Sequence, residues 1–189
     1  MPKKENKVQF NLKNVHYAVL TTNGLEPAWD TPVAVPGAVT LTLDPQGEVS
    51  PFYADGIVYY QSVANNGYSG SLEIARMPDQ MLQDIWGMTL DDTDFVLMEN
   101  SNVEPKSFAL LYQIDGDADR QYYCLYNCSG TRPAIGGTTT TGAKTPQTQS
   151  SSISAVALEN GNVLARTTSQ TPDAVKAEWF KKVYEKEAA

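Results

Sequence analysis

Apolar and polar residues alternate along much of the chain, which is the pattern of half-buried β-strands. In AVTLTL (38–43), one valine and two leucines fall on one face and two threonines on the other. Similar runs predict further strands at 55–63, 71–76, 107–114 and 121–128. Between 151 and 168, an Asn160-Gly161 pair separates two more apolar runs, and such a pair predicts a β-hairpin.

Two segments instead repeat apolar residues at the spacing of an α-helix. The first begins at Pro78 and ends at Gly87, with an apolar stripe of Met81, Leu82, Ile85 and Trp86. The second spans about 172–184, after Thr171 as N-cap, with an apolar stripe of Val175, Trp179 and Val183. Many strands with one helix between them and one near the end predict a mainly β (α+β) fold, a sandwich or barrel with helices packed against it.

Two stretches interrupt this regular pattern. Residues 44–66 form a long excursion between two strands, and Asn-Asn-Gly at 65–67 predicts the tight turn that ends it. Gly70 then permits a bulge or a close approach of the backbone where the chain re-enters the sheet. Residues 135–152 are rich in threonine, serine and glycine. That composition favours a flexible loop, although threonine also has good strand propensity.

Length and composition fit a single domain. The chain has 189 residues, of which 41% are hydrophobic, enough for a substantial core. It contains no apolar run of about 18 residues, and residues 1–10 lack the apolar region of a signal peptide. We therefore expect a soluble protein made in a cytoplasm, with no membrane partner. Cys124 and Cys128 lie four strand residues apart, about 13 Å, which is too far for a disulfide, so both are expected to be reduced.

Charge is unevenly distributed along the chain, whose formal net charge is -8. Residues 79–119 hold ten acidic side chains and a single basic one, Lys106. This is the wrong sign for gripping nucleic acid, which relies on Lys and Arg at the phosphates. Two interpretations of the acidic segment stay open: solvated loops, or a surface that repels polyanions.

The motifs that would support catalysis or metal binding are incomplete. His16 is the only histidine, so no His/Cys cluster for zinc can form. GYSGS (67–71) fits neither a nucleophile elbow nor a phosphate-binding loop, because the glycine and lysine positions do not match. The aspartates of DGDADR (115–120) match three ligands of a calcium loop, but an arginine and a tyrosine replace the required glycine and glutamate. These six residues are better interpreted as a hairpin connection. We therefore predict no catalytic residue, cofactor or metal, and a protein that is not an enzyme.

Several segments, in order, resemble the major tail tube proteins of siphophages, the phages with long non-contractile tails, that infect Gram-positive bacteria. They are VPGAVTLTLDPQGE (35–48), FYADGIVYY (52–60), ANNGYSGSLEIARMPD (64–79), SFALLYQIDGD (107–117), CLYNCSGTRPAIGGTT (124–139) and KTPQTQSSSISA (144–155). A C-terminal WFKKVY (179–184) is similar too. The resemblance covers most of the chain and implies one tail tube domain over 1–189, with two packed antiparallel sheets flanked by a helix.

The resemblance also implies a function and a set of partners. The subunits would assemble with copies of themselves into hexameric rings that stack into a tube, a conduit for genome DNA ejection into the host. The implied partners are the tape measure protein, the tail terminator and the distal tail protein. Duplex DNA would pass through the lumen without specific binding. The protein would be assembled in the host cytoplasm and end in the virion, as part of the phage tail.

The long excursion of about 44–66 is the arm expected to contact neighbouring subunits. An N-terminal arm of about 1–14 and the tail after Tyr184 are secondary candidates. The candidate contact residues are Pro45, Phe52, Tyr53, Asp55, Val58, Tyr59, Tyr60, Asn65, Asn66 and Tyr68.

Other hypotheses remain open for the same residues. The tyrosines could simply pack within a sheet, or they could form the sugar platform of a soluble β-sandwich carbohydrate-binding or adhesin module. Such modules usually act after secretion, and no secretion signal is visible at residues 1–10. A small cytoplasmic hydrolase is a third hypothesis, and the sequence offers it no nucleophile–base pair.

Overall fold

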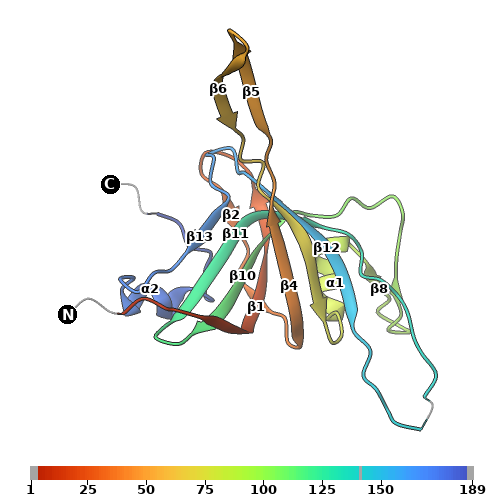
Figure 1. Ribbon diagram of the computed structural model, residues 1–189. Coiled ribbons are helices and arrows are strands. Elements are labelled where there is room, and N and C mark those ends of the chain that lie inside the picture. The colour runs from red at the N-terminus through yellow and green to blue at the C-terminus, as the bar shows by residue number, and fades with distance from the viewer. Residues whose placement is uncertain (1–3, 141, 187–189) are drawn as a thin grey trace.

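The computed structural model describes residues 4–140 and 142–186 and is built mainly from strands (Figure 1). Strands make up 45% of it and helices 8%, which confirms the prediction of a mainly β fold. The elements in chain order are β1 Gln9–Thr22, β2 Ala28–Trp29, β3 Val33–Ala34, β4 Ala38–Pro45, β5 Val49–Ala54, β6 Ile57–Val63, β7 Tyr68–Ile74, α1 Asp79–Trp86, β8 Thr89–Leu90, β9 Leu97–Met98, β10 Phe108–Gly116, β11 Arg120–Gly130, β12 Gln149–Val156, β13 Leu164–Arg166 and α2 Asp173–Glu178.

Nine of these strands form one antiparallel sheet. Its order is β2-β1-β10-β11-β12-β7-β4, with β3 also paired to β1 and β13 also paired to β11. The sheet curves, and its end strand β4 comes into contact with β1 (Figure 1). Two small two-stranded sheets, β5–β6 and β8–β9, lie outside it.

The sheet is covered on both faces, so the chain has two hydrophobic clusters. Tyr17 and Ala18 are neighbours in β1 but belong to different clusters, because successive strand residues point to opposite faces. The first core cluster lies under α1 and includes Leu72, Ile85, Trp86, Phe108 and Leu110. The second core cluster lies under α2 and the chain that follows it, and includes Leu111, Cys124, Tyr126, Trp179 and Val183.

Strand β11 is the centre of this packing. All three tryptophans of the chain donate their indole N–H to its backbone carbonyls. Trp29 donates to Tyr126 (3.0 Å), Trp86 to Gly130 (3.0 Å) and Trp179 to Tyr123 (3.2 Å). A buried carbonyl without a hydrogen-bond partner is costly. Each indole ring therefore packs in the core and also provides a hydrogen-bond donor for a carbonyl of β11.

The prediction of a β-hairpin at Asn160-Gly161 is wrong. β12 and β13 do not pair with each other; both run antiparallel to β11, one after the other along the same strand. The intervening loop closes on itself, since the Leu158 N–H donates to the Asn162 carbonyl and the Gly161 N–H to the Leu158 carbonyl, both at 2.9 Å. The buried Leu158 side chain anchors the loop in the second core cluster. The chain therefore resumes in its original direction.

Both helices occur where the sequence predicts them, with corrected ends. Pro78 is the N-cap of α1 rather than its first residue, and the helix ends at Gly87 in the left-handed conformation. In α2 the N-cap is Pro172, not Thr171, whose hydroxyl instead accepts the Thr168 N–H at 2.9 Å. The predicted helix of 172–184 is too long, because after Glu178 the chain turns. Within the described residues, no helix combines the length and apolar character needed to cross a bilayer.

The predicted N-terminal arm is shorter than expected. Residues 9–14 belong to β1 and pair with β10, so they are not a free arm. Positive φ values at Asn11 (66°) and Asn14 (49°) accompany two register shifts in this part of β1. These bulges break the alternation of apolar and polar residues, which is why the strand is not evident in the sequence. Residues 1–3 of the arm, like 187–189 of the C-terminal tail, lie outside the described residues.

Candidate functional site

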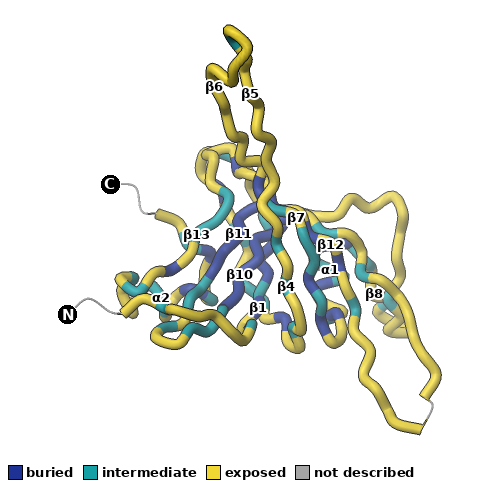
Figure 2. Tube along the Cα trace, in the orientation of Figure 1, coloured by how far each residue is buried: buried dark blue, intermediate teal, exposed yellow. Residues whose placement is uncertain are grey.

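The hairpin of β5 and β6, residues 49–63, stands away from the body of the molecule (Figure 1) and is exposed along its length (Figure 2). We call it the hairpin arm. It continues the β4–β7 pair, since the Gln46 N–H donates to the Gly67 carbonyl (2.8 Å) and the Ala64 N–H to the Glu48 carbonyl (3.0 Å). The excursion of 44–66 therefore leaves and re-enters the sheet at the same place, as an extended ribbon.

Local sequence explains the shape of the hairpin arm. Asp55 and Gly56 connect the two strands, and both have positive φ (52° and 74°). Asp-Gly is a preferred pair for this tight turn, which matches the twist of the flanking strands. A register shift places Phe52 opposite Tyr60 and Tyr53 opposite Val58. Tyr59 is the extra residue of the resulting β-bulge.

The hairpin arm carries apolar side chains on both of its faces. The exposed ones, between 48% and 72% accessible, are Val49, Phe52, Tyr53, Ile57, Val58, Tyr59, Tyr60 and Val63. Together they present roughly 900 Å² of largely apolar surface. The only charged side chain in 49–63 is Asp55, at the tip. An isolated two-stranded hairpin is marginally stable in water, and an apolar patch of this size is typical of an interaction surface.

The structure brings most of the predicted contact residues together. Phe52, Tyr53, Asp55, Val58, Tyr59 and Tyr60 all lie on the hairpin arm. Exposed Pro45, Asn65 and Asn66 lie at its base. Tyr68 does not belong to this surface, because it is half-buried and packs against the first core cluster. Ordinary sheet packing explains Tyr123 and Tyr126, which are buried, but not the tyrosines of the hairpin arm.

A second exposed apolar surface was not predicted. It surrounds the β8–β9 sheet and consists of Leu90, Phe95, Val96, Met98 and Val103, which are 40% to 75% accessible. The run FVLM at 95–98 was the available signal. Among the described residues, this run pairs with another strand at only two positions, so most of it is left facing solvent. Val49, Ile57 and Val63 of the hairpin arm were also not predicted as contact residues, because the prediction relied mainly on aromatic side chains.

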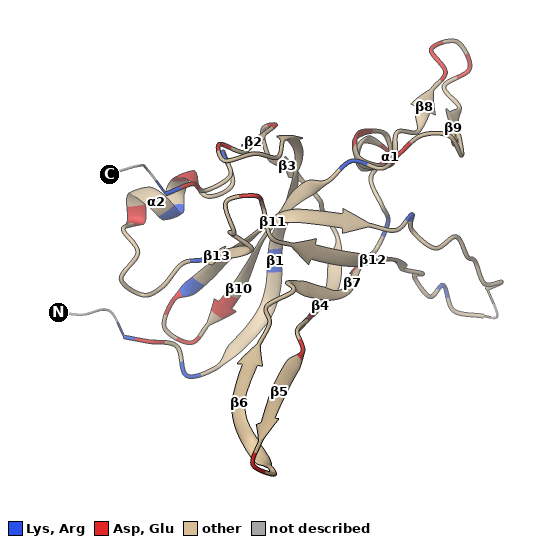
Figure 3. Ribbon diagram, turned by 90° about the horizontal axis from the view of Figure 1, so that it is seen from above, with Lys and Arg blue, Asp and Glu red and all other residues tan. Residues whose placement is uncertain are grey.

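Six of the ten acidic side chains of 79–119 lie in two places, and the other four lie on α1 or in the chain that follows β9 (Figure 3). One is the tip of β8–β9, where the Asp91 carboxylate accepts the N–H groups of Thr93 (2.9 Å) and Asp94 (2.8 Å). These hydrogen bonds lower the pKa of Asp91 below its ordinary value. The other is the β10–β11 turn, on the opposite side of the body. The acidic side chains thus do not form a single surface.

At the β10–β11 turn, the aspartates that imitate a calcium loop bind the chain's own N-terminal segment. Asp117 accepts the Lys7 N–H at 2.7 Å, which lowers the pKa of this carboxyl group. The pKa of Asp115 is lowered as well, first by the Gln113 amide and then by Lys13, whose ammonium is 3.1 Å away. Among the described residues, no three His, Cys, Asp or Glu side chains form a metal-binding group.

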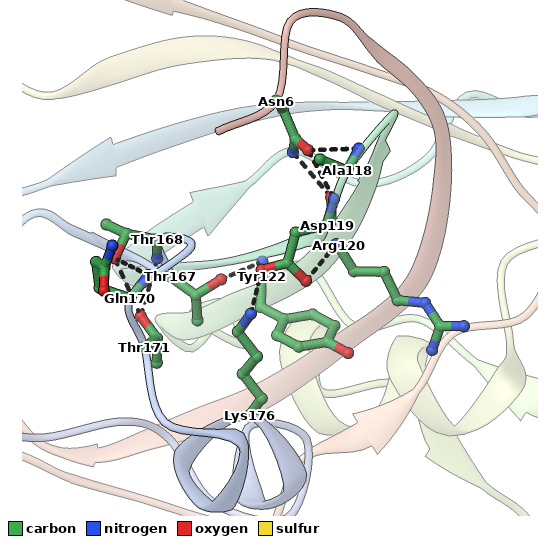
Figure 4. A network of polar contacts seen from close by, with 10 residues as sticks. All are labelled: Asn6, Ala118, Asp119, Arg120, Tyr122, Thr167, Thr168, Gln170, Thr171 and Lys176. Carbon is green, nitrogen blue, oxygen red and sulfur yellow. Dashed lines mark hydrogen bonds and ion pairs between the residues drawn. The ribbon is translucent and has the colours of Figure 1, made fainter. Parts of the chain in front are cut away.

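The same turn joins the N-terminal segment to α2 (Figure 4). The side-chain oxygen Oδ1 of Asn6 accepts the N–H groups of Ala118 (3.0 Å) and Asp119 (2.7 Å), while its side-chain Nδ2 donates to the Asp119 backbone carbonyl (2.8 Å). The Asp119 carboxylate forms an ion pair with Lys176 of α2. These polar contacts hold three distant parts of the sequence together, and the groups that make them find their partners within the chain.

The side chains with catalytic potential are used structurally. His16 stacks on Phe180 at 4.7 Å between ring centroids. Cys124 and Cys128 are both free and buried, which confirms that they are reduced. A bulge in β11 places them in different core clusters. Burial raises the pKa of Cys128 to about 12 and that of Cys124 well above its ordinary value, so both thiols stay protonated and unreactive.

The arrangement is suited to binding another protein chain. The outer edges of β5 and β6 present backbone groups with no partner strand in the part of the chain that the structure describes. Aromatic and aliphatic side chains cover both faces of the ribbon, and the charge is confined to its tip. In comparisons with known proteins, no family model matches the chain, and no curated protein matches it.

Proposed function

We propose that this protein is the major tail tube subunit of a phage with a long, non-contractile tail. It polymerises as stacked hexameric rings into a hollow tube, the conduit for genome DNA during ejection into the host. The observation that carries the proposal is the hairpin arm, which is exposed, apolar on both faces and almost uncharged. Contacts of a projecting arm with a different surface of the next copy generate rings and open-ended stacks.

The rest of the chain supports this proposal. The tail tube fold expected from the resemblance, two packed sheets flanked by a helix, is compatible with a curved sheet that α1 covers. Proposed partners besides the protein itself are the tape measure protein, the tail terminator and the distal tail protein. The net charge of -8 suits a conduit through which DNA slides, because attraction to phosphates would slow its passage.

Electron microscopy of the purified protein tests the proposal directly. At high concentration, negative staining should show rings or tubes with a central hole. Deletion of residues 45–63 should leave a folded monomer that forms neither, because the hairpin arm makes no part of either core cluster. Tubes formed by the deletion variant would refute the role of the arm.

The exposed tyrosines of the hairpin arm also permit a carbohydrate-binding or adhesin module. A glycan array distinguishes the two functions: saturable sugar binding by a protein that stays monomeric at every concentration would replace the tail tube proposal. A gel-shift experiment with duplex DNA at physiological salt adds a second check. No retardation is expected, and a salt-sensitive shift would contradict a conduit that repels DNA.

A further inference from the structure

A second long projection leaves the body between β11 and β12. We call residues 131–140 and 142–148 the loop arm; it is exposed along its length (Figure 2). Its first residues are tied to β12, since the Thr131 N–H donates to the Ser152 carbonyl (2.9 Å) and the Ala134 N–H to the Ser150 carbonyl (3.0 Å). Beyond Ala134, no backbone–backbone hydrogen bond engages the described residues of the arm. A long segment of this kind in a compact domain is usually either functional or a disordered linker.

The loop arm runs out from the body and back (Figure 1), and it carries an apolar side chain that is almost fully exposed. Thr138 donates its hydroxyl to Gln147 at 2.8 Å, which connects the outgoing and returning limbs. Ile135 is 92% exposed, more than any other large hydrophobic residue described. No residue that the structure describes covers Ile135, so this side chain is available to another molecule.

The charges of the two arms are complementary. Residues 44–66, which hold the hairpin arm, contain Asp44, Glu48 and Asp55 and no Lys or Arg. Residues 131–148 contain Arg132 and Lys144 and no Asp or Glu. Arg132 forms an ion pair with Glu99, whereas Lys144 has no ion pair among the described residues. Opposite charges on two surfaces speed their encounter and disfavour wrong partners.

The two arms point away from one another. The hairpin arm projects from the top of the molecule in Figure 1 and the loop arm from the bottom, so they cannot meet within one chain. In a stack of identical copies in the same orientation, the top of one copy faces the bottom of the next. This is the geometry of a heterologous contact, which continues without closing.

We infer that the loop arm of one copy docks on the hairpin arm of the neighbouring copy, with Ile135 against its apolar surface and Lys144 toward its acidic side chains. The inference rests on the proposed function, because it names the surface that receives the arm. The occupant is a second copy of this chain. Ile135 and the hairpin arm both offer exposed apolar surface, and the basic loop arm is opposite in charge to residues 44–66.

Disulfide trapping between two single variants tests the contact. Copies carrying Ile135→Cys are mixed with copies carrying either Val58→Cys or Tyr60→Cys, which probe the two faces of the hairpin arm, and are then oxidised. The matched control is Val39→Cys, a residue of similar exposure (51%, against 48% for Val58) on β4, outside every segment expected to contact a neighbour. The native cysteines are buried and do not compete. Each variant alone is oxidised in parallel to identify homodimers.

The expected result is a mixed dimer with at least one hairpin-arm variant, at ten-fold or greater yield over the Val39→Cys control. Electron microscopy of the same samples separates the two proposals. Tubes without the mixed dimer would overturn the docking inference and leave the tail tube function standing. The mixed dimer without rings or tubes would support the docking and refute the function. Equal yields with Val39→Cys would overturn the inference, because the contact would then be unspecific.

Discussion

Replacing Phe52 and Tyr60 together by serine should abolish assembly while leaving the monomer folded. The two side chains face each other across β5 and β6 and are 60% and 64% exposed. They contribute to no core cluster, so the monomer loses only a cross-strand pair, worth about 0.2–1 kcal/mol. Folding and assembly are thus expected to respond very differently to one perturbation.

The size of the assembly effect follows from the exposed areas. A phenylalanine and a tyrosine at these exposures present roughly 250 Å² of surface to a neighbour, or about 6 kcal/mol if all of it were buried and apolar. Incomplete burial and the tyrosine hydroxyl reduce this to about 3 kcal/mol per subunit. A loss of that size raises the concentration needed for assembly about 100-fold.

The assay measures light scattering against protein concentration, with electron microscopy to identify the particles and thermal unfolding to monitor the monomer. Val39→Ser is the matched control, because it removes an apolar side chain of similar exposure (51%) on β4, outside every segment expected to contact a neighbour. The reasoning is refuted if the double variant assembles at the wild-type concentration. It is refuted equally if the melting temperature of the double variant falls by much more than about 4 °C, since the loss of one cross-strand pair accounts for no more than that.

Other predictions concern the body of the molecule. Ile85→Ala, at a position with no exposed surface, should lower the free energy of unfolding in urea by about 2–5 kcal/mol; a change below 1 kcal/mol would contradict the packing of α1. Gly70→Ala would place a Cβ atom 1.8 Å from the Thr42 carbonyl oxygen, so β4 must move away from β7 and the melting temperature should fall, whereas Ser69→Ala beside it should be neutral. The pKa of Asp117 is lowered by the Lys7 N–H, so its stabilising charge is present above the ordinary pKa of 3.8 and is lost as the pH falls through the lowered pKa. Heteronuclear NOEs of the Lys7 amide should therefore show an ordered N-terminal segment at pH 6 and a mobile one in strong acid. In Asp117→Asn they should show mobility already at pH 6, and an unchanged NOE would exclude the contact.

The sequence predicts strands well where alternation is unbroken and poorly where bulges or tertiary contacts intervene. β4 was predictable from its valine and leucines, but the first part of β1, residues 9–14, was not, because the register shifts near Asn11 and Asn14 break the alternation. Asn160-Gly161 is a strong local signal for a hairpin, yet burial of Leu158 sends the chain onward beside β11 instead. Pairing between distant strands depends on contacts that no local pattern contains.

The position of the candidate site along the chain could be predicted from the sequence better than the individual residues that form it. A long excursion ending in Asn-Asn-Gly located the hairpin arm, and the apolar residues within 49–63 indicated its chemistry. Whether a given tyrosine is exposed depends on its distance from the sheet, so Tyr60 and Tyr68 could not be separated by sequence alone. The loop arm is a further example, since composition predicts its flexibility but not the direction in which it projects.

The hairpin arm shares no core residue with the body, which has an evolutionary consequence. Substitutions in residues 49–63 have little effect on folding, so selection acts on them mainly through the surface that the arm contacts. Partner choice can therefore drift, or be redesigned, while the scaffold stays intact. Grafting the hairpin arm onto another protein of the same architecture is therefore expected to transfer its choice of assembly partner.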